Sequence, residues 1–358
     1  SLMVVHSIAD KSRFDFRKVQ DLVVKLAESS GVPYEDAVLF AEALVWADVR
    51  GTSTHGVSRV DIYLRRIEKG LIDPAANLKT ENRSPGVLVA DAGKGLGQVQ
   101  AVRVLERLYP IASKLGVASA TIRNSQHFGA SSHYCELAAE KDMILLVTTN
   151  SEPAMPAHGS TDAFFGTNPI AVSFPTGKGY SVKIDLATSV TARGNILAAA
   201  KEGREIPSGW AIDPEGHPTT DAESALQGAV LTMAGHKGYA LAMLVEILSG
   251  VLSGSAVGSG IGSMYKDMDR KQNVGHFFCL FDISSFMDVA VFKDRIDHMI
   301  DSIKDGRKQP GADEIFVPGE RTRKKIIENQ KMGIPIDKST LEELETLCQK
   351  RGIPFTLF

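Results

Sequence analysis

Cysteine is scarce in this sequence: the 358 residues contain three, at Cys135, Cys279 and Cys348. They are widely spaced, odd in number and form no CxxC pair, so a disulfide framework is excluded and a reducing, cytoplasmic location is favoured. Neither an HExxH motif nor a cluster of Cys and His residues is present, although both patterns are typical of zinc proteins. We therefore expect no metal site.

Strongly charged and long apolar segments are also missing. The formal net charge is −3, and the densest basic stretch, at residues 321–325, runs into Glu328 and is typical of a solvated helix start. Nothing in this charge pattern favours a nucleic-acid partner. No apolar segment reaches the roughly 18 residues that a membrane-spanning helix needs. With 43% hydrophobic residues, the chain is predicted to be a globular protein of about two domains.

Hydrophobic periodicity separates a helical N-terminal region from a mixed region. Apolar spacing predicts helices over Phe16–Ser29, Pro33–Ala47 and about His55–Lys69. From Val87 onward, β-rich runs alternate with helical stretches, which predicts an α/β region. The strands expected there are Val87–Ala90, Val117–Arg123, Ile144–Thr149, Ile170–Phe174 and Val182–Asp185. The later helices expected are Ala101–Leu115, Ser132–Lys141, a buried Tyr239–Leu252, Phe292–Lys304 and Leu341–Gln349.

A glycine-rich turn at residues 91–98 lies between an expected strand and an expected helix. That is the context of a dinucleotide-binding turn, whose glycines let backbone amides approach a pyrophosphate. The motif is incomplete, however, because Gln occupies both position 98 and position 100. No acidic residue follows the next strand to bind a ribose, since Arg123 and Asn124 stand there. The pattern favours an ordinary glycine turn over a Rossmann site.

The segment at residues 50–63 carries the clearest candidate chemistry. If a helix begins near His55, then His55, Arg59 and Tyr63 lie on one face at positions i, i+4 and i+8. Arginine can bind a carboxylate through two parallel hydrogen bonds, and histidine can exchange a proton with the neighbouring oxygen. This set therefore suits a small 2-oxo or 2-hydroxy acid. The alternative is a solvated helix face capped by Thr54.

A second histidine, His127, lies between an expected strand and an expected helix, where α/β proteins commonly place catalytic groups. A structural role is the alternative, and His133 points away from His127, so the two would chelate a metal poorly. Hydroxyls in residues 184–190 and the amides of residues 235–238 are also suited to binding phosphate. Either segment alone is weak evidence of a site.

Six blocks in order carry a resemblance that extends over most of the chain: THGVSR (54–59), RNSQHFGAS (123–131), FGTNPIAVSFP (165–175), IDLATS (184–189), GHKGYAL (235–241) and PGER (318–321). Together they resemble the type-2 malate/L-lactate dehydrogenase family. That family also includes ureidoglycolate, sulfolactate and diketogulonate oxidoreductases and a cyclic-imine reductase. The resemblance implies an NAD- or NADP-dependent oxidoreductase that forms a homodimer.

The same resemblance implies a non-Rossmann α/β fold, in which a mixed sheet binds the dinucleotide. A helical domain would be built from both ends of the chain. The boundaries we expect are an N-terminal helical segment at 1–86 with substrate-binding residues, an α/β cofactor-binding region at 87–319, and a C-terminal helical segment at 320–358 that packs on the first.

Matched block by block, the resemblance assigns roles to individual residues. His55 and His127 would be the acid/base candidates, supported by Thr54, and Arg59 and Tyr63 would bind substrate. The residues expected to contact the cofactor are Ser151, Ile184, Asp185, Leu186, Ala187, Thr188, Ser189, Val190, His236, Lys237, Gly319, Glu320 and Arg321. Two positions depart from relatives: Thr54 stands where many have Ser, and His158 stands where many have Gly.

The expected reaction is hydride transfer between nicotinamide and the carbon that bears the oxygen of a malate- or L-lactate-type acid. We favour His127 as the base during oxidation, with His55 beside the carboxylate or relaying the proton. A ureido acid, a diketogulonate or a cyclic imine carboxylate remains an alternative substrate, and a non-catalytic small-molecule sensor is the alternative from another class. Arg193 is a weak signal for the 2′-phosphate of NADP.

Overall fold

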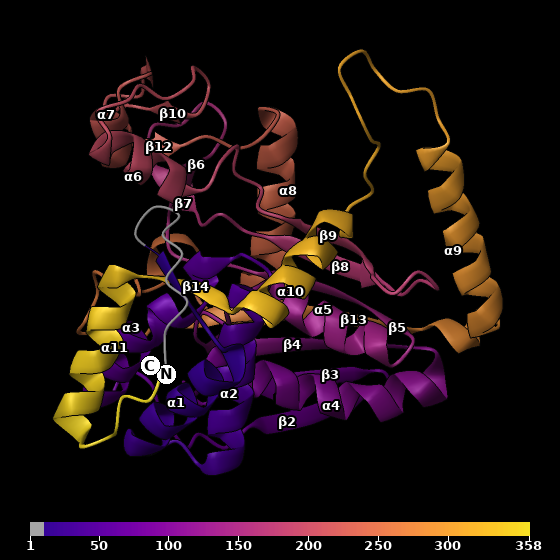
Figure 1. Cartoon of the computed structure of the whole chain (residues 1–358), viewed down its shortest axis with the longest axis horizontal. Coiled ribbons are helices and arrows are strands. Elements are labelled where there is room, and N and C mark those ends of the chain that lie inside the picture. The colour runs from indigo at the N-terminus through magenta and orange to yellow at the C-terminus, as the bar shows by residue number, and fades with distance from the viewer. Residues whose placement is uncertain (1–10) are drawn as a thin grey trace.

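A seven-stranded mixed sheet forms the centre of the molecule (Figure 1). The computed structural model describes residues 11–358. Its sheet has the strand order β2-β3-β4-β13-β5-β8-β9, and only β3 and β4 run parallel. These strands are β2 (Lys79–Ser84), β3 (Val87–Asp91), β4 (Val117–Ser125), β5 (Met143–Thr149), β8 (Ile170–Phe174), β9 (Val182–Leu186) and β13 (Val274–Asp282). The mixed sheet agrees with the predicted fold class.

Helices surround the sheet and fill the two ends of the chain. The α-helices are α1 (Phe16–Ser29), α2 (Tyr34–Val49), α3 (Val60–Glu68), α4 (Gly97–Leu115), α5 (Ser131–Glu140), α6 (Arg193–Lys201), α7 (Ala222–Gln227), α8 (His236–Glu246), α9 (Val289–Lys304), α10 (Glu320–Met332) and α11 (Lys338–Arg351). The short strands outside the central sheet are β1 (Lys11–Phe14), β6 (Met155–Pro156), β7 (Ala163–Phe165), β10 (Ala211–Ile212), β11 (Pro218–Thr219), β12 (Ala229–Val230) and β14 (Ile334–Asp337). In Figure 1, α6, α7 and β10 form a small lobe beyond the sheet.

One hydrophobic core lies between the sheet and two helices. Alternate residues of β3 and β4, including Leu88, Ala120 and Ile122, are buried against apolar residues of α4 and α5 such as Leu105 and Tyr134. Period-two alternation sends every second strand residue to this side of the sheet. The β3–α4–β4 unit is the parallel crossover that such packing requires. This packing fixes where β4 ends and the loop with His127 begins.

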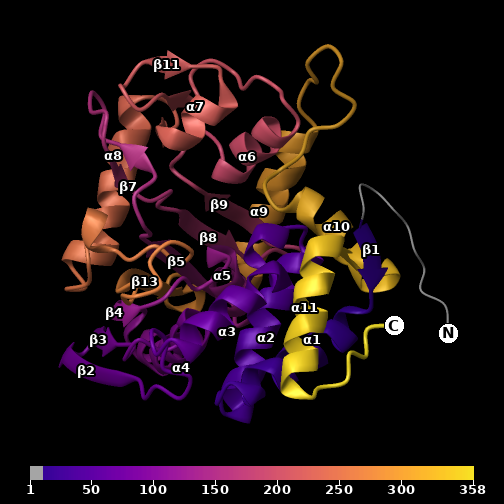
Figure 2. The same ribbon diagram turned by 90° about the vertical axis from the view of Figure 1, so that its left-hand side faces the viewer.

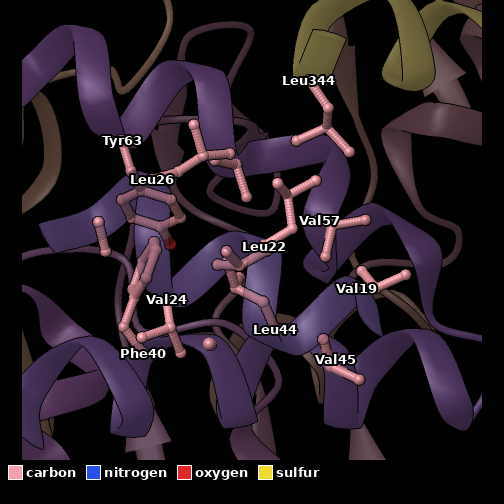
Figure 3. Packing of buried hydrophobic residues seen from close by; sticks show 14 of the residues in the cluster. Val19, Leu22, Val24, Leu26, Phe40, Leu44, Val45, Val57, Tyr63 and Leu344 are labelled. Carbon is pink, nitrogen blue, oxygen red and sulfur yellow. The ribbon is translucent and has the colours of Figure 1, made fainter. Parts of the chain in front are cut away.

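A second core joins the two ends of the chain. β1 pairs antiparallel with β14, and α11 contacts both α1 and α3 (Figure 2). In the packed interior, Val19 and Leu22 of α1 lie near Leu44 of α2 and Leu344 of α11 (Figure 3). The expected helical domain from both termini is therefore present. The residue boundaries proposed for the three segments remain a prediction.

Two expected helices differ from the structure. The helix expected from His55 is wrong at its start, because residues 53–59 form two 3₁₀ turns and α3 begins only at Val60. The Asp48 carboxylate, which belongs to α2, accepts the Val57 N–H at 2.8 Å. A Cβ on Gly56 would collide with that carboxylate, so glycine is required where the chain turns. A contact from another helix therefore overrides the local helical pattern.

The stretch Tyr239–Leu252 was also predicted incorrectly, because it is not a single buried helix. α8 ends at Glu246 and is followed by a π-helical turn, and Val251 and Leu252 are exposed by 60% and 58%. Its apolar composition predicts burial, but α8 lies at the outer edge of the molecule (Figure 2). Across residues 11–358, none of the helices combines the length and the apolar character needed to cross a bilayer.

Candidate active site

Most of the predicted site residues lie at one end of the central sheet. His127 follows β4, Ser151 follows β5, and residues 187–190 follow β9. The pairings Val274↔Ser125, His276↔Thr149 and Ile170↔Leu186 bring these strand ends level with one another. Residues that are far apart in sequence therefore converge because of strand order and register.

The two candidate histidines face each other. His55, at the end of the first 3₁₀ turn, and His127 have ring centroids 5.5 Å apart with 23° between their planes. The Thr54 hydroxyl lies 3.1 Å from His55 Nδ1, so the hydroxyl at this position supports the ring as expected. Both side chains are partly buried, which leaves one side of the pair accessible.

His127 is held from several directions. Its Nδ1 accepts the Gly129 N–H at 3.2 Å, and its own backbone N–H donates to Gln272 Oε1 at 3.1 Å. The Tyr63 hydroxyl donates to the His127 carbonyl at 3.1 Å and lies 3.4 Å from Nδ1. Because Nδ1 faces these protein groups, Nε2 is the nitrogen left for a substrate. The Gly129 contact favours a neutral ring with its proton on Nε2.

Tyr63 is buried in the protein interior beside His127. The side chain is 0% exposed, packs edge-on against Phe40 at 5.2 Å, and its hydroxyl accepts the Gln98 amide at 2.8 Å (Figure 3). Burial is the main cause that raises the pKa of Tyr63 to about 12, so the phenol stays protonated. These contacts support a role in positioning His127. Direct contact between Tyr63 and substrate remains a prediction.

The glycine turn at residues 91–98 supports this arrangement. A Cβ on Gly97 would collide with the backbone carbonyls of Gln126 and His127, so the glycine lets α4 begin directly against the histidine loop. Gln98, which occupies a position where a Rossmann site needs glycine, instead donates to Tyr63. The incomplete dinucleotide motif therefore has a structural explanation: the turn packs against His127.

Arg59 is anchored at one nitrogen and free at another. Its Nε donates to the Thr54 carbonyl at 2.6 Å, and its Nη1 lies 3.3 Å from Met264 Sδ, a weak acceptor. Within residues 11–358 it forms no ion pair, and Nη2 has no hydrogen-bond partner. A guanidinium that is held in place but not neutralised is suited to bind an incoming carboxylate.

Both histidines are poor bases in this environment. Burial first, and then the nearby Arg59 charge, lowers the pKa of His55 to about 4. The same two causes, followed by the charge on His55, hold the pKa of His127 well below 6.5. Near neutral pH the two rings are therefore uncharged. A bound carboxylate would offset the Arg59 charge, which is the second cause, while the effect of burial on both pKa values would remain.

The predicted cofactor residues of β9 lie on the edge strand of the sheet. Asp185 accepts the Ser132 hydroxyl at 2.6 Å, while Leu186 and Val190 are exposed by 51% and 37%. Thr188 is buried and donates to the carbonyls of residues 167 and 168, both at 3.1 Å. The neighbouring Ser189 hydroxyl is buried and has no partner among the described residues. Ile184 and Ala187 complete this segment.

Two other predicted segments adjoin β9. The Met233 N–H donates to the Thr188 carbonyl at 2.9 Å, which brings the start of α8, with exposed His236 and Lys237, next to this strand. The His158 and His236 rings lie 6.3 Å apart, so the position that departs from relatives faces the same region. On the other side, the Lys183 N–H donates to the Pro318 carbonyl at 3.1 Å.

Residues 319–321 are therefore next to β9, but not all of them are free. The Glu320 carboxylate binds Lys304 Nζ at 2.7 and 2.9 Å, and the Arg321 guanidinium lies 4.4 Å above the Phe316 ring. Gly319 adopts φ 101° at the turn into α10. A cofactor contact by Glu320 would have to come through its backbone, and the predicted role of all three remains a prediction.

Comparison with known sequences decides the family. The profile of the family described as "Malate/L-lactate dehydrogenase" matches residues 14–345. This chain belongs to that family. The match covers both the histidine pair and the β9 region.

Relatives in this family differ in the substrates that they are named for. The L-sulfolactate dehydrogenase of Methanocaldococcus jannaschii is 36% identical over 93% of this chain and 95% of its own length. Its solved structure superposes with a TM-score of 0.90 at 35% identity, covering 95% of this chain and 98% of that one. A malate dehydrogenase of Pyrococcus horikoshii is 36% identical over 92% and 93%. An NAD⁺ ureidoglycolate dehydrogenase of Escherichia coli is 32% identical over 81% and 83%.

Sequence reasoning missed several residues that organise this family member's site. His276 is fully buried, lies 4.3 Å from the Phe128 ring in a parallel stack, and binds the Ser125 and Thr149 hydroxyls at 2.7 Å each. It belongs to β13, a central strand that was not predicted. The apolar run at 277–281 was the available signal. Gln98, Gln272 and the loop that contains Met264 gave no local signal at all.

Proposed function

We propose that this protein is an NAD- or NADP-dependent oxidoreductase that interconverts a small 2-hydroxy acid and the corresponding 2-oxo acid, of malate, sulfolactate or L-lactate type. The observation that carries the proposal is the convergence of Arg59, His55 and His127 in one partly open site. A free guanidinium beside two neutral imidazoles provides a carboxylate-binding group and proton carriers within one small volume. The named activities of the relatives are consistent with it.

The region around β9 fits a nicotinamide dinucleotide. The buried Ser189 hydroxyl lacks a partner among the described residues, and the nearby start of α8 carries Lys237 in its first turn, where the helix dipole favours anions. Exposed apolar side chains at Leu186 and Val190 provide a surface for flat rings. Residues 184–190, His236 and Lys237 would hold the cofactor, with Ser151 and the 319–321 turn nearby. When bound, the cofactor supplies or accepts the hydride.

Arg59 positions the substrate in this proposal. Its Nη1 and Nη2 bind the carboxylate, while the Nε contact with Thr54 keeps the guanidinium in one orientation. Orientation of this kind converts an encounter into a reaction within one complex, which contributes a large part of the rate enhancement of enzymes. The bound carboxylate also reduces the positive potential at both histidines. Substrate binding thereby removes one of the causes that lower the pKa of each ring, although not burial, the largest one.

His127 exchanges the proton with the substrate oxygen through Nε2. In the oxidising direction Nε2 must be bare, so the ring proton has to lie on Nδ1. The Tyr63 oxygen, 3.4 Å away, is the acceptor that can hold that proton. The Gly129 N–H favours the other tautomer. Tyr63 therefore positions His127 and makes its basic form accessible, and His55 lies beside the carboxylate or relays the proton.

The test combines a substrate panel with two histidine variants. Purified protein is mixed with oxaloacetate, sulfopyruvate, pyruvate, a ureido acid and a cyclic imine carboxylate, each with NADH or NADPH, and loss of the reduced nicotinamide absorbance is followed. We expect turnover of at least one 2-oxo acid. His127→Ala and His55→Ala should lower kcat, one of them by about 10²–10⁴-fold, which is the usual contribution of general acid–base catalysis.

His217→Ala is the matched control, because His217 is a surface histidine with its side chain 77% exposed. It should retain wild-type rates. Near wild-type turnover in both His55→Ala and His127→Ala would show that the proton assignment is wrong. Dinucleotide binding without turnover of any acid or imine would instead indicate a non-catalytic sensor. Turnover of the cyclic imine carboxylate alone would show that the substrate is an imine and not a 2-oxo acid.

We also propose that the protein is a cytoplasmic homodimer. In α9 only Ile300 is buried, while Val291, Met299 and Ile303 are exposed by 46%, 50% and 44%, and the helix stands away from the sheet in Figure 1. Three large apolar side chains exposed on one helix favour contact with a protein partner. All three cysteines are free, which is consistent with a reducing compartment. Sedimentation equilibrium should give twice the chain mass, and a monomer would contradict the dimer.

A further inference from the structure

The buried side chain of Arg66 holds one loop in place beside the candidate active site. Arg66 of α3 is 0% exposed, and its guanidinium donates to the carbonyls of Met264 at 3.1 Å, Asp267 at 2.7 Å and Arg270 at 2.9 Å. Arginine offers five N–H donors in a rigid plane, so three carbonyls that meet it are fixed relative to one another. Residues 263–270, which we call the 263–270 loop, therefore have one preferred conformation.

The 263–270 loop places two side chains beside Arg59. Met264 is buried, and its sulfur lies 3.3 Å from Arg59 Nη1. Tyr265 is 52% exposed, and its ring centroid lies 5.7 Å from the Arg59 guanidinium carbon. After burial as the main cause, the Tyr265 phenol also contributes to the raised pKa of Tyr63. Tyr265 is thus a solvent-exposed side chain next to Arg59.

We propose that the 263–270 loop selects the substrate through Tyr265, whose hydroxyl donates to a second polar group of the substrate. That group would be an oxyanion or carbonyl, such as a carboxylate or sulfonate, at the end of the acid remote from the carboxylate bound by Arg59. The inference rests on the proposed oxidoreductase function and specifies its substrate class. It selects 2-oxo acids with a second acceptor over those that end in a methyl group.

The neighbouring contacts give Tyr265 this role. Arg59 Nε is occupied by Thr54, so its two remaining nitrogens can bind one carboxylate and leave little capacity for a second anion. The phenol of Tyr265 is within reach of that space and has no hydrogen bond to residues 11–358. Hydrogen bonds to charged acceptors contribute more than those between neutral groups. One hydroxyl can therefore produce strong discrimination.

The experiment compares kcat/KM for oxaloacetate and for pyruvate in the wild type and in Tyr265→Phe, with whichever reduced dinucleotide supports turnover. The wild type should prefer oxaloacetate. Tyr265→Phe should lower kcat/KM for oxaloacetate by roughly ten- to hundredfold and leave the value for pyruvate within about threefold. The change removes one oxygen from an exposed side chain, so the fold is retained.

Tyr109→Phe is the matched control, since Tyr109 of α4 also carries a cation, Lys141, 5.1 Å from its ring. It should change neither value. An equal loss for both substrates, no loss for either, or a wild type that prefers pyruvate would overturn the role of Tyr265. If the wild type turns over no 2-oxo acid, the result would instead contradict the proposed function.

If no substrate is turned over, binding measurements test whether Tyr265 selects ligands with a second anionic group. Calorimetry with tartronate, which has two carboxylates, and glycolate, which has one, measures selection without chemistry. The wild type should bind tartronate more tightly, and Tyr265→Phe should lose that preference. The absence of a preference in the wild type, or its persistence in Tyr265→Phe, would contradict the inference.

Discussion

The two halves of the candidate site are built in opposite ways. On the histidine side, Tyr63, Arg66 and His276 are fully buried and form hydrogen bonds to neighbouring elements, with only Arg66 Nε of these side chains unpaired among the described residues. On the dinucleotide side, Leu186 is 51% exposed and His236 and Lys237 project into solvent. The fold itself therefore organises the half that contains the two histidines. The other half becomes buried only when a cofactor or a second molecule covers it.

The energetic consequence is that function and stability are linked on one side and separable on the other. A buried charge that is stripped of its partners, or carbonyls left without their donor, costs far more free energy than a change at the surface. Substitutions on the histidine side should therefore affect folding as well as catalysis. Substitutions on the dinucleotide side should affect binding alone. Three measurements examine this difference.

The largest effect is expected for Arg66→Met. The variant keeps the apolar stem but leaves the carbonyls of Met264, Asp267 and Arg270 without their donor inside the protein. We expect the free energy of unfolding to fall by about 3–5 kcal/mol in urea denaturation followed by circular dichroism. Arg65→Met is the control on the same helix, since its side chain is 51% exposed and pairs with Asp61 at the surface. Its loss should stay within about 0.5 kcal/mol. Similar losses of unfolding free energy in both variants would show that the buried contacts of Arg66 contribute no more to stability than a surface ion pair.

The second prediction concerns acid. Burial, the main cause at both residues, lowers the pKa of His133 and of His276 to about 3. In the unfolded chain each histidine titrates near 6.5, so below that pH the unfolded state binds protons that the folded state does not. The stabilisation is complete above pH about 6.5. It should be lost as the pH falls toward 3, at a limit of about 1.4 kcal/mol per pH unit for each residue.

Unfolding free energies measured between pH about 7 and about 5 check this slope. His276→Gln can keep both hydroxyl contacts but cannot be protonated, so its curve should be flatter by up to about 1.4 kcal/mol per pH unit. His217→Gln removes an exposed histidine and should leave the slope as in the wild type. A slope that is unchanged in His276→Gln would show that this histidine is not the cause of acid sensitivity.

These contrasts also show what the sequence made predictable. The strands β3, β4, β5, β8 and β9 were expected to within about two residues, because β-rich runs with alternating burial are a local signal. β13 was missed, although it lies at the centre of the sheet, because its place between β4 and β5 depends on distant pairings. The same limit applied to Val57, whose cap comes from Asp48 on another helix.

The site shows the same division. His55, Arg59 and His127 were candidates on residue type and resemblance, and the structure brings them together. The partners that orient them, such as Gln98 and Arg66, carry no motif, because their function depends on what packs against them. Tyr63 shows the same limit: its substrate contact remains a prediction, while its burial and its hydrogen bond to the His127 carbonyl could not be predicted from the sequence.

The smallest expected effect is on the dinucleotide side, at Lys237. The residue lies exposed in the first turn of α8, where its charge adds to the positive end of the helix dipole, which favours anions. Lys237→Ala should raise KM for the dinucleotide about tenfold, equivalent to roughly 1.4 kcal/mol, and should leave kcat nearly unchanged. Because no other described side chain bonds to Lys237, the free energy of unfolding should change by less than about 0.5 kcal/mol. Added salt should reduce the difference in KM between the wild type and the variant, since an exposed charge is screened.

Lys201→Ala, at an exposed lysine of α6, is the control and should alter neither the KM for the dinucleotide nor the free energy of unfolding. A loss of stability in Lys237→Ala comparable to that of Arg66→Met would mean that the two halves of the site are equally part of the folded core.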